Sequence, residues 1–166
     1  MHGPRLLETL RSIHFLDDMP DAGLQLLARA ARLEGYEPEI VLFREGEPLD
    51  RVFLVAEGSV ALEALVPEHG ARWIQTIRAG ELLGWSAVLG RPPLTATART
   101  LTPCRLVVLD AAGVLALCRH DAGFGFDFMR RTAGVLADRL SATRKLLVEA
   151  YGQCLPTVMG LHEGAD

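Results

Sequence analysis

The chain has 166 residues, of which 49% are hydrophobic and 23% are charged. This length suits one domain with a single core, and the composition excludes intrinsic disorder and fibrous repeats. The formal net charge of -4 at pH 7 disfavours direct nucleic-acid binding, which needs clustered lysine and arginine. No apolar run approaches the roughly 20 residues that cross a membrane, and the N-terminus lacks a signal-peptide core. We therefore expect a single domain, 1–166, in a cytoplasmic protein that does not contact membranes.

Two helices are predicted at the N-terminus. In the first segment, apolar residues recur at helical spacing: Leu6, Leu7, Leu10 and Ile13. A second helix is predicted over residues 21–32, because Pro20 and Asp21 form a start signal for it.

Residues 33–109 consist of short β-rich runs that are separated by glycine and proline. Runs at spacings of about 8 to 12 residues, with turn signals between them, predict a β-sandwich or a β-barrel. The predicted strands cover residues 34–37, 39–44, 51–56, 59–66, 71–78, 95–101 and 104–109. A short internal helix is predicted over residues 84–89.

The C-terminal third is predicted to be helical. Asp110 is the expected N-cap of a helix over 111–117, and helix continues to about Tyr151, before a tail over 152–166. Apolar and small residues follow a heptad repeat in this segment: Met129, Ala133, Leu136, Leu140, Thr143, Leu147 and Ala150. This stripe predicts a homodimer that forms through the long helix. The alternative is that the stripe packs on the barrel of its own chain.

Two glycine-marked stretches carry most of the functional information: residues 43–62 and residues 80–100. In the first, Gly46 and Gly58 enclose a continuous apolar run, which predicts a β-hairpin. In the second, Gly80-Glu81 precedes a glycine turn and the short helix. Together they resemble the cyclic nucleotide-binding domain family, over about residues 13–151. The resemblance implies an α+β fold: a double-stranded β-helix, or jelly-roll, barrel with N-terminal helices and a long C-terminal helix.

The resemblance also implies a ligand site. In the family, a Gly-Glu pair opens the phosphate-binding cassette, in which the glutamate holds the ribose 2'-hydroxyl and backbone amides meet the cyclic phosphate. The family usually closes the cassette with Pro-Arg, but here Leu94 follows Pro93, so leucine stands where arginine pairs with the phosphate. Arg91 is a candidate substitute, and Trp85 is expected either to stack on a base or to fill the pocket. The expected ligand-binding residues are Gly80, Glu81, Leu82, Gly84, Trp85, Arg91, Leu94 and Thr95.

Trp85-Ser86 is similar to the GWS loop of small bacterial members that lack a DNA-binding domain. About 15 residues follow the long helix, too few for a helix-turn-helix. The first hypothesis is a regulatory domain that senses a cyclic nucleotide or another small anion and acts on an unidentified protein partner. The alternative is a ligand-free, dimeric interaction module whose pocket is filled by Trp85 and Leu94.

Catalytic signatures are missing from the sequence. No GxSxG, Walker or GxGxxG pattern occurs, and the five histidines do not have the spacing of metal ligands. We expect no enzyme activity, no metal and no cofactor, so a metal-dependent jelly-roll enzyme ranks last.

Overall fold

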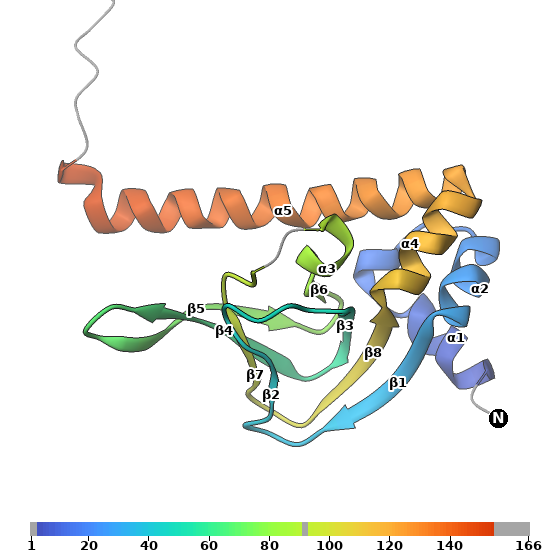
Figure 1. The fold of residues 1–166 in the computed structure, drawn as a ribbon, viewed down its shortest axis with the longest axis horizontal. Coiled ribbons are helices and arrows are strands. Elements are labelled where there is room, and N and C mark those ends of the chain that lie inside the picture. The colour runs from blue at the N-terminus through green and yellow to red at the C-terminus, as the bar shows by residue number, and fades with distance from the viewer. Residues whose placement is uncertain (1–2, 91–92, 155–166) are drawn as a thin grey trace, which may run out of the picture. The chain divides into compact units, whose positions relative to one another are not determined.

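The computed structural model describes residues 3–90 and 93–154 and contains both helices and strands (Figure 1). The chain divides into two compact units, residues 1–132 and 133–166. The helices of the first unit are α1 (Gly3–Arg11), the 3-10 turn η1 (His14–Leu16), α2 (Asp21–Arg29), α3 (Ser86–Leu89), α4 (Ala111–His120) and the first part of α5 (Ala122–Tyr151). Its strands are β1 (Ala31–Tyr36), β2 (Val41–Phe43), β3 (Arg51–Glu57), β4 (Ser59–Val66), β5 (Gly70–Arg78), β6 (Leu82–Leu83), β7 (Thr97–Thr100) and β8 (Cys104–Asp110).

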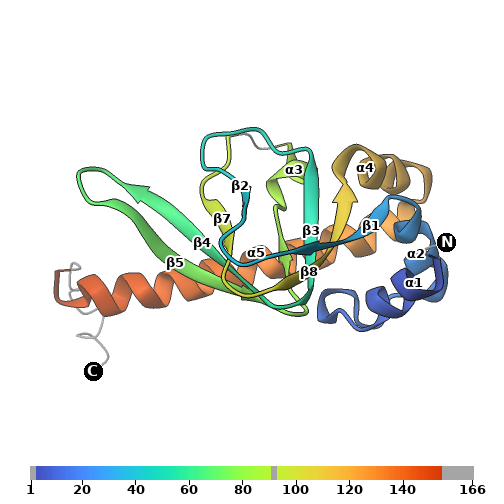
Figure 2. The ribbon, with the colours of Figure 1, turned by 90° about the horizontal axis from the view of Figure 1, so that it is seen from below.

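The strands form two antiparallel sheets of four. One has the order β1-β8-β3-β6 and the other the order β2-β7-β4-β5. Figure 2 shows the β4–β5 hairpin extending beyond the other strands, while α1, α2 and α4 gather near β1. The mixed fold and the long C-terminal helix confirm the predicted fold class.

The core of the barrel lies between the two sheets and centres on β3. The run from Val52 to Val55 is at most 1% exposed, because neighbouring strands and side chains cover it. The rings of Phe43 and Phe53 lie 6.1 Å apart, joining β2 to β3 across the core. Gly58 turns the chain from β3 into β4 with φ +90°, and a Cβ there would lie 2.5 Å from the Pro103 carbonyl oxygen. Only glycine suits this corner.

The structure moves several predicted boundaries. The helix predicted over 21–32 ends at Arg29, because residues from Ala31 onward pair with β8 instead. Residues Leu82–Leu83 form β6 against Phe53 and Leu54, a two-residue strand that the pattern did not reveal. The helix predicted over 111–117 continues to His120. Pairing between strands explains the end of α2 and the presence of β6, and local periodicity does not detect such pairing.

Arg131 connects the first part of α5 to η1 through hydrogen bonds. Its side chain is 10% exposed, and Nε donates to the Asp127 carboxylate at 2.7 Å. Its Nη1 donates to the carbonyl oxygens of Phe15 and Asp17. Burial raises the pKa of Asp127, but the hydrogen bonds from Arg131 and Arg130 outweigh that effect and hold it below its ordinary value.

The second unit contains the rest of α5 and a 3-10 turn, η2 (Gly152–Cys154). Large apolar side chains are exposed along this part of α5: Leu140, Leu146, Leu147, Val148 and Tyr151. None of the helices among the described residues combines the length and apolarity of a membrane span.

Candidate functional site

The site centres on the segment that runs from Gly80 through β6 and α3 to β7, and we call its described residues, 80–90 and 93–97, the cassette. Gly84 turns the chain from β6 towards α3 with φ +79°. A Cβ on Gly84 would lie 2.9 Å from Leu49 Cδ2 and 3.1 Å from the Arg51 carbonyl oxygen. The missing side chain therefore lets the cassette approach the loop before β3.

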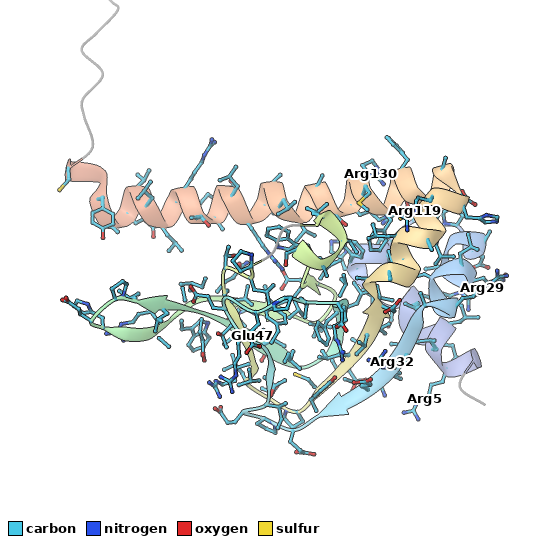
Figure 3. All side chains as sticks on the ribbon, viewed as in Figure 1. Arg5, Arg29, Arg32, Glu47, Arg119 and Arg130 are labelled. Carbon is cyan, nitrogen blue, oxygen red and sulfur yellow. The ribbon has the colours of Figure 1, made fainter. Side chains whose placement is uncertain are left out.

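A small cavity lies between the cassette and that loop. It has a volume of about 140 Å³, and we call it the cassette cavity. Its described lining residues are Glu47, Pro48, Leu49, Ser86, Ala87, Gly90 and Leu94. Two backbone hydrogen bonds close one side, from Gly46 N to Leu94 O at 2.9 Å and from Leu94 N to Glu47 O at 3.3 Å. Figure 3 labels Glu47 on the loop.

The cavity wall is mostly apolar. Leu94 is 6% exposed and belongs to the core cluster that includes Phe43 and Phe53, so its side chain packs into the barrel. Glu47 is the charged side chain among the described lining residues, and it is negative. This arrangement offers a phosphate no cationic partner from the described wall.

The turn before β6 connects this region to the N-terminal helices. Gly80 N donates to Val55 O at 2.8 Å, and Gly80 O accepts from Phe15 N at 2.9 Å. The Glu81 carboxylate accepts a hydrogen bond from the backbone N–H of Arg78 at 2.5 Å. Glu81 therefore satisfies an amide of its own turn.

Known proteins identify the family. The sequence model of the cyclic nucleotide-binding domain matches residues 33–121, which is more than half of the chain. The chain belongs to the cyclic nucleotide-binding domain family. The description of this family names cyclic nucleotides as the ligand, and a regulator is among the relatives.

Several relatives are larger than this chain. A CRP-like cAMP-activated global transcriptional regulator of Mycobacterium tuberculosis is 24% identical over 142 residues, which cover 75% of this chain and 62% of the regulator. A Rhodopseudomonas palustris protein, provisionally named a potassium channel protein, is 38% identical over 100 residues, covering 60% of this chain and 23% of that protein. The chain thus spans less than two thirds of these relatives.

Among solved structures, the fold resembles a cyclic nucleotide-binding domain from Methylobacillus flagellatus. The TM-score is 0.75 at 20% identity, with 93% of this chain and 85% of the other covered. This likeness independently supports the jelly-roll fold.

Of the eight residues predicted from the family to bind ligand, Leu94 lines the cassette cavity. Glu81 and Thr95 are exposed and are not among its lining residues, while Leu82 is fully buried in β6. Trp85 is partly buried and precedes α3 as its N-cap residue. Gly80 and Gly84 shape turns, and Arg91 lies outside the described residues. Gly80 and Glu81 are thus not among the described lining residues of the cassette cavity.

Sequence reasoning missed the loop side of the cavity, formed by Glu47, Pro48 and Leu49. A signal for it was present, because Gly46 and Pro48 lie between a short strand and the buried run of β3. The pattern marked a turn, but only the pairing with Leu94 shows which segment the turn faces.

Other chemistry finds little support in the part of the chain that is described. No group of three or more His, Cys, Asp or Glu among these residues is arranged to hold a metal ion. All three cysteines are free thiols. Burial raises the pKa of the Cys118 thiol, which makes it a weaker nucleophile at neutral pH.

Proposed function

We propose that this chain is a regulatory domain that senses a small molecule, a cyclic nucleotide or another small anion, through the cassette cavity. The observation that carries the proposal is the position of this cavity, between α3 and the loop before β3. Both glycine-marked motifs meet there. Membership of the cyclic nucleotide-binding domain family supports the ligand class.

The size of the cavity bears on how a ligand would enter. At about 140 Å³ it is smaller than the roughly 300 to 1,000 Å³ of ordinary small-molecule pockets. Binding of a whole nucleotide therefore requires α3 and the loop at Glu47–Leu49 to move apart. Such an opening is a population shift that the ligand stabilises.

The signal would leave through α4. Asp50, next to the cavity residue Leu49, accepts a hydrogen bond through its carbonyl from Ala111 N at 2.9 Å. Ala111 is the first residue of α4, and Asp110 caps the same helix. Movement of the loop would therefore alter the start of α4, and a protein partner would detect the change.

Calorimetric titration with cyclic AMP, cyclic GMP and cyclic dinucleotides tests this proposal directly. We expect measurable heat and a rise in melting temperature at up to millimolar ligand. Leu94→Arg supplies the guanidinium missing from the described wall and should bind a cyclic nucleotide at least 10-fold more tightly. Thr95→Arg is the matched control, because it adds the same charge at an exposed neighbouring position. Absence of heat and of any thermal shift in the wild-type protein would contradict the proposal.

A second candidate is a ligand-free interaction module. It is favoured by Leu94, whose side chain is part of the barrel core where the family usually places a phosphate-binding arginine. In this case a partner protein would bind equally well with and without every tested nucleotide. Titration of the partner in both conditions separates the two candidates.

We also propose a homodimer that forms through α5. The heptad stripe includes Leu140 and Leu147, which are 56% and 49% exposed. Burial of such side chains is the usual driving force for helix pairing. Leu140→Glu should lower the dimer fraction in sedimentation experiments, whereas Leu146→Glu, which lies off the stripe, should change it less. A mass that stays monomeric at all concentrations would exclude the dimer.

A further inference from the structure

A larger cavity lies away from the cassette, where α2, β1 and α4 meet. It has a volume of about 400 Å³, and we call it the junction cavity. Arg29 contributes from the end of α2 and Arg32 from β1, while Gly113 and Leu117 contribute from one side of α4. Figure 3 labels both arginines at this end of the first unit. None of these residues lines the cassette cavity.

Three small residues are among the described residues that line the junction cavity. Ala30 and Ala31 lie between the two arginines, and Gly113 faces them from α4. A Cβ on Gly113 would lie 3.1 Å from the Ala30 Cβ. The elements are also fastened together, because Asp110 N donates to Ala30 O at 3.0 Å. The missing side chain of Gly113 therefore lets α4 approach Ala30 closely, and the hydrogen bond holds these two walls together.

The charged side chains at the junction cavity differ in their hydrogen-bond and ion-pair partners. Arg29 has no hydrogen-bond or ion-pair partner for its side chain within residues 3–90 and 93–154. Arg32 pairs with Glu34 through Nε, which leaves its terminal nitrogens as further donors. The Asp110 carboxylate accepts from Gly113 N at 2.6 Å and so serves as the α4 cap. Among the described lining residues, the guanidinium of Arg29 is therefore a cation without a partner, and the Asp110 carboxylate is the negative charge of the same wall.

We propose that the junction cavity binds a small organic anion, a carboxylate or a phosphate ester that also carries an apolar group. Arg29 and Arg32 would pair with the anion, since a guanidinium presents donors in the geometry that carboxylate and phosphate oxygens accept. Ala31 and Leu117 would contact the apolar group. The volume of about 400 Å³ falls within the range of small-molecule pockets.

This site goes beyond the proposed function, since it is a second binding site with its own residues. A ligand there would touch α2, β1 and α4 at once. It would therefore stabilise the contact between the barrel and α4, and the folded protein would gain stability by mass action.

Phenyl phosphate and benzoate are suitable probes, because each joins one anionic group to one apolar ring. Backbone amide resonances should be followed during a titration of the whole chain. We expect shifts at Ala31 and Gly113, and smaller changes at Gly90 in the cassette cavity. Affinity should fall as salt concentration rises, because exposed ion pairs are screened. Benzyl alcohol, which lacks the charge, should bind at least 10-fold more weakly than either anion.

Variants at exposed arginines make the test specific. Arg29→Ala should weaken phenyl phosphate binding at least 10-fold, and Arg29→Lys should weaken it less because the charge is kept. Arg119→Ala is the matched control: it removes an exposed arginine of α4 that does not line the cavity, and affinity should stay within twofold. The proposal is overturned if neither anion binds at millimolar concentration, if both alanine variants lose affinity equally, or if the shifts centre on Gly90. Cyclic nucleotide titration of Arg29→Ala reports separately on the cassette, so the two sites fail independently.

Discussion

The cassette cavity and the junction cavity differ in what forms their walls. The first has a wall made by a core side chain, Leu94, and a volume of about 140 Å³. The second has walls of small residues and exposed arginines, and a volume of about 400 Å³. The described wall of the cassette cavity thus carries no positive side chain, whereas two arginines line the junction cavity. Backbone shape and ligand chemistry can diverge separately within one fold.

The largest expected effect concerns Leu94. If this wall residue belongs to the core, Leu94→Ala should lower the free energy of unfolding by about 2 to 5 kcal/mol. Arg29→Ala in the junction cavity should stay within about 0.5 kcal/mol, because the side chain is exposed. Denaturant titration of both variants measures the contrast. Equal stability of Leu94→Ala and Arg29→Ala would contradict the view that Leu94 supports the core whereas Arg29 does not.

A second test separates backbone strain from packing in the cassette. Gly84→Ala forces a side chain into left-handed backbone and against Leu49, and it should cost about 2 to 4 kcal/mol in stability. Gly90→Ala is the matched control, since Gly90 is also left-handed, with φ +61°, but has nothing within 4 Å of an added Cβ. It should cost about 1 kcal/mol. Thermal unfolding of both variants measures the difference. Equal losses of stability in Gly84→Ala and Gly90→Ala would show that close packing at Gly84 is unimportant.

Asp110 lines the junction cavity and also caps α4. Asp110→Ala removes the acceptor for Gly113 N and should lower stability by about 1 kcal/mol. Asp110→Asn keeps an acceptor oxygen and should lose only a fraction of that. Denaturant midpoints provide the comparison, and an alanine variant as stable as the asparagine variant would argue against the cap.

The smallest effect is expected at Glu34, beside Arg32. A hydrogen bond from Tyr36, and then the pairing with Arg32, hold the pKa of Glu34 below its ordinary value of 4.5. Because the folded pKa is lowered, this carboxylate stabilises the fold above pH 4.5, and the contribution disappears as pH falls through the folded pKa. Glu34→Gln should therefore flatten the acid limb of the stability curve by less than about 1 kcal/mol. An unchanged acid limb would place the effect at another carboxylate.

The same hydrogen bond acts in the opposite sense on its donor. Burial, and then the bond to Glu34, raise the pKa of Tyr36 to about 12. The neutral phenol therefore stabilises the fold below pH 10, and this contribution is lost as pH rises towards 12. In an absorbance titration of the tyrosines, the ionisation of Tyr36 should occur at lower pH in Glu34→Gln than in the wild-type protein.

Sequence patterns predicted the barrel well because glycine corners and buried runs have strong local signals. Gly46 lies in the loop before β3, and Gly58 directly follows β3. The strand β4 occupies its predicted residues, 59–66. The failures lie where pairing between distant segments overrides local pattern. Residues 31–32 were predicted to be helical, yet they belong to β1 and pair with β8.

The candidate site was harder to predict for the same reason. A motif gives the order of residues, but it does not show which carboxylate faces a cavity. Glu81 has a backbone amide close by in its own turn, and it bonds to that amide. The loop at Glu47 and the junction arginines lie far apart in sequence from the segments they face, so periodicity carries no information about them.

The bond between Asp50 O and Ala111 N has a thermodynamic consequence. Asp50 follows the cassette-cavity residue Leu49, and Ala111 follows the junction-cavity residue Asp110, so one peptide hydrogen bond of 2.9 Å joins the rims of both cavities. A ligand in one cavity that strains or strengthens this hydrogen bond would change the free energy of ligand binding in the other cavity. By linkage such a change would be reciprocal, so that an occupant of either cavity would alter the affinity of the other by the same factor.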